Sequence, residues 1–342
     1  MVKEGEICKR NAERVFYGLA FQVNAAILLM LRYIDKLDGV RLEGKREDIE
    51  LTLVDDKKVY AQAKSVVNAN NDYRSVRRNL YKTLITLAEA AQDDVKNDAR
   101  YIYVTNSPNP LKDENLRRVI SGETLLPFEA LPEESQNILN KAITRPKSLV
   151  PLDRFSIYYF PYVSDDLKER EKIVRNEVEK FVNNISEYAK AGMGEKLLKL
   201  WQKDLFDSAM IYNKGVKLSK KDVIWPLILI LTQYFPDSDM YEDMEEEVLD
   251  IVEQIYSETI NQFSERWEFV TQVLYDYNAF AYNGPRKMKH IAFAQQKWPD
   301  YIEQFKPFVK EDDICEAFTK VLLMNVLRRR RAITSIKARL HV

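Results

Sequence analysis

Residues 43–64 read EGKREDIELTLVDDKKVYAQAK, and this stretch sets the architecture expected for the first half of the chain. Apolar and polar residues alternate in two runs within it. The polar positions of the two runs are Asp48, Glu50 and Thr52, followed by Tyr60, Gln62 and Lys64. Because successive side chains of a strand point to opposite faces, each run predicts a half-buried strand. The polar link 55–58 is short enough for a hairpin turn between them.

Pairing of these two strands would bring carboxylates and a lysine together on one surface. Asp48 and Glu50 belong to the first strand, and Lys64 ends the second. Carboxylate oxygens are ligands for hard divalent cations, and an ammonium group offsets the charge of a phosphate. The pattern therefore predicts a site that holds a divalent metal next to a phosphate group.

Helices and strands are expected to alternate around this hairpin. They are a buried helix over about 11–37 that Gly39 ends, a strand over 40–43, a helix over about 72–91 with Asp72 as its N-cap, a strand over 100–105, a helix over about 133–143 and a strand over 154–160. Three- and four-residue spacing of apolar residues indicates the helices, and β-branched and aromatic residues indicate the strands. The expected order is α-β-β-β-α-β-α-β.

From about residue 164 onward the sequence favours helices. The helical segments expected there are 165–191, 195–211, 220–234, 240–282 and 312–339. No strand pattern of comparable quality follows Phe160. We therefore expect an α/β domain over residues 1–162 and an all-α domain over residues 163–342.

Composition excludes several classes of site and of protein. The net charge of −1 gives no overall basic character, so contacts with nucleic acid must come from local patches. Two histidines and two distant cysteines argue against a zinc site, a catalytic triad or a disulfide scaffold. Nine scattered glycines contain no phosphate-binding loop motif. Apolar runs such as 224–231 are too short to span a bilayer, so we expect a soluble, cytoplasmic protein that does not bind membranes.

The residues of the hairpin resemble the motif of the PD-(D/E)xK, restriction-endonuclease-like superfamily. The matching residues are the aromatic-Gln step Phe21-Gln22 on the first helix, then Glu43 and Asp48-Ile49, then Gln62-Ala63-Lys64. The Q-x-K form is similar to that of Mrr-type restriction enzymes, and more so to the double-strand DNA endonuclease domains that serve as effectors in bacterial antiphage defence. The resemblance covers residues 11–160.

This resemblance implies Mg²⁺- or Mn²⁺-assisted hydrolysis of a DNA phosphodiester by in-line attack of water. Asp48 would be the main metal ligand, and Lys64 would position or deprotonate the attacking water and offset charge on the phosphate. Gln62 stands where many relatives have a carboxylate, and its amide oxygen is a weaker ligand. Glu43, at the end of the preceding strand, or Glu50, on the face of Asp48, would then supply the missing charge.

Each of these residues also has a purely structural interpretation. Alternating charges on a strand are often a solvated face, and Glu43 or Glu50 could simply pair with Arg41, Lys45 or Arg46. Gln22 could reach the site from the first helix, or it could be a hydrogen-bonding residue of the core.

Two basic clusters are candidates for binding DNA phosphates. The first follows the site on the next helix and consists of Arg74, Arg77, Arg78 and Lys82. The second is the run Arg328–Arg331, which could bind DNA or a partner protein, or favourably end a helix. For both clusters a solvated helix face is the alternative.

The resemblance also implies how such a nuclease works in the cell. Double-stranded DNA is the expected substrate, and a sensor of the same defence complex, an SMC-like ATPase with an accessory subunit as in Lamassu-type systems, is the expected regulator. Active effectors of this kind are homo-oligomers, and the helical domain would provide regulation, oligomerisation or partner binding. Two alternatives remain open: a catalytically degenerate DNA-binding or scaffold subunit, and a nuclease activated by a cyclic nucleotide bound to the helical domain.

Overall fold

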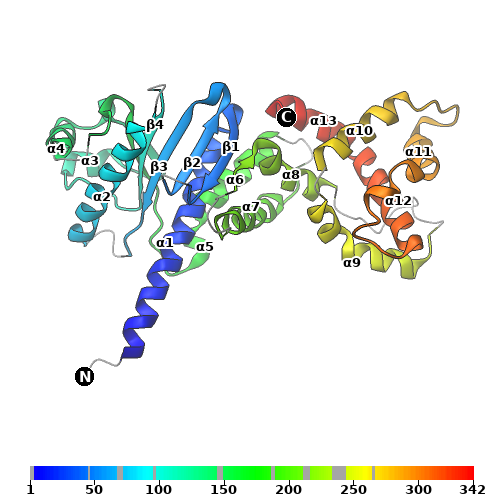
Figure 1. Ribbon diagram of the computed structural model, residues 1–342, viewed down its shortest axis with the longest axis horizontal. Coiled ribbons are helices and arrows are strands. Elements are labelled where there is room, and N and C mark those ends of the chain that lie inside the picture. Colours follow the sequence, from blue (N-terminus) through cyan, green and yellow to red (C-terminus); the bar gives the residue numbers. More distant parts are fainter. Residues whose placement is uncertain are drawn as a thin grey trace. The chain divides into compact units, whose positions relative to one another are not determined.

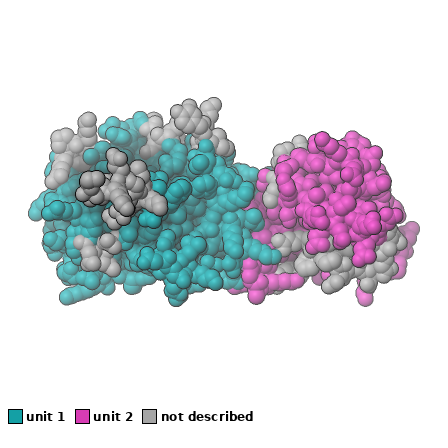
Figure 2. All heavy atoms as spheres, turned by 90° about the horizontal axis from the view of Figure 1, so that it is seen from below, with its two compact units in different colours: residues 1–182, 194–223 teal, residues 183–193, 224–342 magenta. Residues whose placement is uncertain are grey.

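The computed structural model describes residues 4–44, 47–67, 72–94, 98–144, 149–185, 189–210, 216–232, 244–263 and 266–342, with side chains from Ala12 onward. The chain divides into two compact units (Figure 2). Unit 1 comprises Met1–Val182 and Gly194–Val223, and unit 2 comprises Asn183–Met193 and Ile224–Val342. This division does not coincide with the boundary expected near residue 162, because two later segments of the chain join the first unit.

Unit 1 is an α/β unit in which helices flank one sheet (Figure 1). Its first elements are α1 (Glu4–Arg32), β1 (Leu37–Leu42), β2 (Ile49–Leu53), β3 (Lys58–Lys64), α2 (Tyr73–Gln92) and β4 (Arg100–Thr105). The next are α3 (Glu114–Val119), β5 (Thr124–Pro127), α4 (Glu133–Ile143), β6 (Phe155–Tyr159), α5 (Leu167–Arg170), α6 (Lys172–Ile185), α7 (Met193–Met210) and β7 (Leu218–Ser219). The predicted α/β class of the first half is thus confirmed, and short α3, β5 and β7 were not predicted.

The sheet is mixed, and its strand order is β5-β6-β4-β3-β2-β1-β7. Strands β1, β2 and β3 form an antiparallel meander, with Ile49 opposite Ala61 where β2 pairs with β3. Strands β3, β4 and β6 are parallel neighbours, and α2 makes the crossover from β3 to β4. The carboxyl ends of these three strands consequently lie along the same edge of the sheet.

The two faces of the sheet are covered by different helices. Tyr101, Tyr103 and Phe155 belong to a buried cluster with apolar residues of α2, α3 and α4. On the opposite face, α1 contacts β1, β2 and β3. There Phe21 of α1 stacks on Phe160, with 4.8 Å between the ring centroids. The period-two pattern of the sequence is therefore confirmed: one side of β2 and β3 carries Ile49, Leu51, Val59, Ala61 and Ala63, which are all buried.

The first helix is apolar because it is a core element of unit 1. Ala12–Arg32 is long and apolar enough to cross a membrane by length and composition alone. Half of this apolar window is buried within the protein, and its buried residues meet the sheet. The helix ends at Arg32, and Gly39, expected to end it, lies inside β1 instead. A side chain at Gly39 would lie 2.8 Å from the backbone carbonyl oxygen of Leu218, which explains why glycine suits this position of the strand.

Unit 2 is helical in its described part, and α12 lies at its centre. Its elements are the end of α8 (Lys220–Leu231), α9 (Glu246–Gln262), α10 (Arg266–Ala279), α11 (Lys289–Lys297), α12 (Asp312–Arg328) and α13 (Arg330–Leu340). Helix α12 is buried along most of its length and contacts α9, α10, α11 and α13. Phe318 of α12 packs against Phe305, with ring centroids 5.2 Å apart. The predicted helical character of the second half holds for these residues.

The buried side chain of Asn106 connects, through hydrogen bonds, the segments at the edge of the sheet where the candidate site lies. Asn106, which follows β4 and is fully buried, donates to the carbonyl oxygens of Val66 and Tyr162 at 3.0 and 3.1 Å. Its amide nitrogen also lies 3.2 Å from the hydroxyl of Tyr17 on α1, and its oxygen accepts from the Val66 amide at 2.9 Å. This amide holds the end of β3 to β4 and to α1.

We predict that Asn106→Ala lowers the free energy of unfolding by about 2–4 kcal/mol, because it leaves several buried backbone groups without partners. The unfolding midpoint in urea, followed by circular dichroism, measures this loss. The matched control is Asn140→Ala on the exposed side of α4, which should leave the midpoint unchanged. An unchanged midpoint for Asn106→Ala would contradict the prediction.

Candidate functional site

The connection between β1 and β2 fixes where the acidic residues lie. The Glu43 amide donates to the carbonyl oxygen of Asp48 at 2.9 Å, and the Gly44 amide donates to that of Glu47 at 3.1 Å. Glu43 has a φ of +46°, a left-handed conformation that is uncommon for a residue with a side chain. The chain thus turns tightly out of β1, and Asp48 enters β2 directly opposite the end of β3.

Asp48, Gln62 and Lys64 come together as the sequence predicts. The Oδ2 atom of Asp48 accepts from the Lys64 ammonium at 2.9 Å and from the Ala63 amide at 3.0 Å. The Gln62 amide group also donates to the same oxygen. The side chains of Asp48 and Lys64 are 14% and 27% exposed, so the ion pair lies at the surface of a mostly buried cluster.

Gln62 links this cluster to α2. Its side chain is 4% exposed, and its Oε1 atom accepts from the Thr86 hydroxyl at 3.2 Å. In this orientation the amide nitrogen faces Asp48. A hydroxyl group can donate or accept, so Thr86 would tolerate the reversed amide, which turns the Gln62 oxygen toward Asp48. Gln62 can therefore serve either as a hydrogen-bond donor to Asp48 or as an oxygen ligand beside it.

Glu43 and Gln22 meet at the edge of the same cluster. Burial raises the pKa of the Glu43 carboxyl, and the negative charge of Asp48 raises it further. The Lys64 cation and a hydrogen bond from Gln22 oppose this rise. Gln22 thus reaches Glu43 from α1, and its role in supporting the site stays a prediction. A metal-binding role for Glu43 stays a prediction.

The side chain of Glu50 lies next to Arg41 of β1. Its Oε2 atom lies 3.9 Å from the Arg41 guanidinium, and the two residues are paired across β1 and β2. The carboxylate also packs against Gly44 so closely that a side chain there would collide with it. Glu50 shares the face of Asp48 as expected, and its catalytic role likewise stays a prediction.

Glu47 is a residue of this site that the sequence reasoning missed. Its side chain is 3% exposed, and neither carboxylate oxygen has a hydrogen-bond partner in the described part of the chain. Burial, followed by the charge of Asp48, raises the pKa of Glu47 to about 8, while Lys64 opposes the rise. Strand alternation assigns residue 47 to the apolar face, where an acid is anomalous, and this was the available signal.

The donor set around Asp48 suits magnesium better than a softer metal. Among the described residues, no group of three or more histidine, cysteine or acidic side chains is arranged to hold a metal ion. Magnesium, however, is usually held by one or two carboxylates, with water and substrate phosphates as further ligands. Asp48 and an uncompensated neighbouring carboxylate meet this lower requirement.

The basic cluster of α2 is exposed and belongs to the helix that contacts Gln62. Its members Arg74, Arg77, Arg78 and Lys82 are all exposed. Asp72 caps the helix by accepting from the Ser75 amide at 3.0 Å, as predicted. Lys82 lies one helical turn before Thr86, so the cluster extends away from the site along α2.

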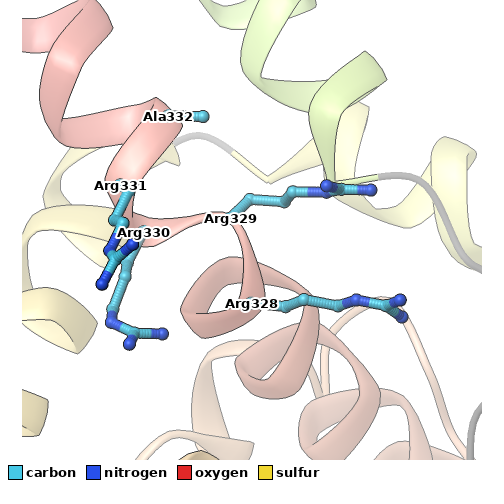
Figure 3. Close-up of a pocket in the computed structure, with 5 residues that line it drawn as sticks. All are labelled: Arg328, Arg329, Arg330, Arg331 and Ala332. Carbon is cyan, nitrogen blue, oxygen red and sulfur yellow. The ribbon is translucent and has the colours of Figure 1, made fainter. Parts of the chain in front are cut away.

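The second basic run lies in unit 2, at the junction of α12 and α13. Arg328–Arg331 line a cavity of about 230 Å³ together with Ala332. Figure 3 shows the side chains of Arg328 and Arg329 extending to one side and those of Arg330 and Arg331 to the other. Arg330 donates to the carbonyl oxygen of Leu327 at 2.8 Å and lies over the Tyr277 ring. At least this arginine has a structural role at the junction.

Comparison of the chain with protein-family models, curated proteins and solved structures gave no match. The interpretation of the site consequently depends on the contacts described above.

We predict that the metal-free protein loses stability as the pH rises from 4.5 toward about 8, because of Glu47. The Glu47 carboxyl ionises near pH 4.5 in the unfolded chain but keeps its proton to about pH 8 when folded, so the unfolded state is favoured across this interval. The slope for one proton approaches about 1.4 kcal/mol per pH unit. Urea unfolding at several pH values in the presence of EDTA measures this dependence of the unfolding free energy on pH.

Glu47→Gln removes the titrating group, so this variant should lose stability less steeply over the same pH interval. Glu134→Gln changes an exposed carboxyl of α4 in the same way and should retain the wild-type slope. Identical slopes for Glu47→Gln and the wild-type protein would refute the assignment.

Proposed function

We propose that the chain is a metal-dependent DNA endonuclease of the restriction-endonuclease-like type. The observation that carries this proposal is the 2.9 Å ion pair between Asp48 and Lys64, with Gln62 on the same carboxylate oxygen. An acidic residue and a lysine in contact at the end of two paired strands are the groups that phosphodiester hydrolysis requires. The two basic clusters are candidate contacts for the substrate backbone.

The architecture of unit 1 supports the same proposal. A helix, three antiparallel strands, a crossover helix and a parallel strand follow one another, as the resemblance to PD-(D/E)xK enzymes implies. The resemblance also places an aromatic-Gln step on the first helix. Here Phe21 is buried against the sheet side and Gln22 reaches Glu43.

Each residue of the site has a proposed role. Asp48 would hold a Mg²⁺ or Mn²⁺ ion, with Gln62 and Glu43 as further oxygen ligands. The bound metal would supply Lewis-acid activation of the water and the phosphate. Lys64 would position the attacking water and offset negative charge that develops on the phosphate, and its contact with Asp48 keeps the ammonium at the site.

The exposed arginines and lysine of α2 would bind the DNA backbone. Arg74, Arg77, Arg78 and Lys82 lie on the helix whose Thr86 contacts Gln62, so a duplex gripped by them would pass close to Asp48. Phosphate contacts of this kind position DNA without reading its sequence. They also make binding depend strongly on salt.

The cellular setting that we propose comes from the resemblance alone. The chain would be a cytoplasmic effector of antiphage defence that cleaves double-stranded DNA when an SMC-like ATPase and an accessory subunit activate it. Unit 2 would then be the part that binds partners or forms homo-oligomers. A variant of this proposal has unit 2 bind a cyclic nucleotide as the activating signal.

A second candidate function is that of a catalytically degenerate DNA-binding or scaffold subunit. The contacts of Asp48 favour it, because the Lys64 ammonium and the Ala63 amide satisfy the carboxylate oxygen without a metal. The two functions differ in whether the chain cleaves DNA under any activation condition.

We predict that Asp48→Ala and Lys64→Ala each lower the rate of plasmid cleavage with Mg²⁺ by at least about a hundredfold, the lower bound for loss of acid–base assistance. The assay uses the purified protein alone and with the products of neighbouring genes. Lys141→Ala, on an exposed turn of α4, is the matched control and should keep the wild-type rate.

Cleavage that survives both substitutions would disprove the site. Discrete fragments would indicate a site-specific enzyme, whereas general degradation fits an effector nuclease. No cleavage by the wild-type protein under any of these conditions would favour the scaffold function.

We further predict that replacing Arg74, Arg77 and Arg78 with glutamine weakens binding to duplexes of any sequence. The slope of log K against log salt should become shallower by about 0.9 for each phosphate that the variant no longer neutralises. Fluorescence anisotropy at several salt concentrations measures it, in EDTA to prevent cleavage. Glutamine at Lys141 and Lys168, both exposed, provides the control. An unchanged slope in the triple variant would show that α2 does not bind DNA.

A further inference from the structure

Glu47 differs from the other carboxylates around Asp48 in its burial and in its lack of partners. It is 3% exposed, and both of its carboxylate oxygens are buried without a hydrogen bond in the described part of the chain. Burying a carboxylate in this way is costly unless the group is neutral or binds a cation. A buried carboxylate without a partner lowers the stability of the fold, and a bound cation would compensate for this cost.

The neighbouring acids are already engaged. Asp48 accepts from Lys64, Gln62 and the Ala63 amide, all through Oδ2. Glu43 receives a hydrogen bond from Gln22, and Glu50 faces Arg41. Of these four carboxylates, only Glu47 lacks a described partner, so its oxygens are the ones open to a metal ion.

The backbone places Glu47 beside Asp48 without help from their side chains. The hydrogen bonds from Gly44 to Glu47 and from Glu43 to Asp48 pair the end of β1 with the two residues that lead into β2. Glu47 and Asp48 are consecutive residues, and the negative charge of Asp48 acts on the Glu47 carboxyl, where it raises the pKa further after burial. Two neighbouring carboxylates, one of them buried without a partner in the described part of the chain, therefore lead into β2.

We propose that the Glu47 carboxylate is a direct ligand, together with Asp48, of a hard divalent cation, Mg²⁺ or Mn²⁺. Glu47 thereby supplies the negative charge that the amide of Gln62 does not. This inference rests on the proposed function for the location of the site, and it chooses a carboxylate that was not among the expected Glu43 and Glu50. Two carboxylates, with water in the remaining positions, are sufficient for magnesium.

Binding of Mn²⁺ to the full-length, metal-stripped protein tests the proposal directly, because electron paramagnetic resonance counts free Mn²⁺ without any activity. Glu47→Gln keeps the size of the side chain and removes its charge. It should weaken Mn²⁺ binding by at least about tenfold, as the loss of even an outer-sphere group can. Glu134→Gln removes an exposed carboxylate of α4 and should bind Mn²⁺ as the wild-type protein does.

Thermal unfolding in EDTA shows whether the variant is folded. Glu47→Gln should unfold at or above the wild-type temperature, because the fold no longer has to keep a buried carboxyl protonated above its ordinary pKa. If Glu47→Gln does not fold, Glu47→Asp keeps the charge but withdraws the carboxylate by one methylene group, and it should also weaken Mn²⁺ binding. Wild-type affinity in a folded Glu47 variant, or no Mn²⁺ binding by the wild-type protein, overturns the inference.

Failure of this inference and failure of the proposed function give different results. A protein that needs Glu47 to bind Mn²⁺ but never cleaves DNA supports the ligand assignment and rejects the nuclease. A protein that cleaves DNA while Glu47→Gln binds Mn²⁺ normally supports the nuclease and rejects the ligand assignment.

Discussion

The contacts of one carboxylate oxygen, Oδ2 of Asp48, join the two strands on which unit 1 is built. They come from three consecutive residues of β3, and they are possible only in the register that sets Ile49 opposite Ala61. A slip of one residue would turn Asp48 away and expose the apolar side of β2. Because β4 pairs with β3 and β6 with β4, the rest of the parallel sheet inherits this register.

Much of this architecture follows from patterns that are local in sequence. Helix α2 with its Asp72 cap, strand β4 and helix α4 form where apolar spacing and capping residues predict them. The predictions that were wrong failed because of contacts between residues far apart in the sequence. Gly39 was expected to end a helix, but it lies in β1, where Ser219 of β7 pairs with it from a distant part of the chain. No local pattern contains that contact.

Some residues of the candidate site could likewise be predicted from local sequence patterns, and others could not. Asp48, Gln62 and Lys64 could be predicted because alternation alone places them on one face, and pairing of β2 with β3 then brings them into contact. The neighbour of Glu50 depended on β1, which sets Arg41 opposite it. Alternation assigns Glu47 to the apolar face, but its lack of partners could not be predicted, since it precedes β2 and its surroundings depend on how the chain leaves β1.

Helix α1 packs against other elements on two sides, and this limits which fragments of the chain can fold by themselves. One side of the helix meets the sheet, and Asn24 accepts a hydrogen bond at 3.0 Å from Gln202 of α7, which also contacts Glu171 at 2.9 Å. Trp201, on the same helix, donates to the carbonyl oxygen of Val223 at 2.7 Å. A fragment that stops near residue 162 would lack the helices that contact α1. The side chain of Asn24, two positions from Gln22, would then be exposed to solvent. Limited proteolysis or truncation should therefore yield a stable form of unit 1 only if α7 stays attached to it.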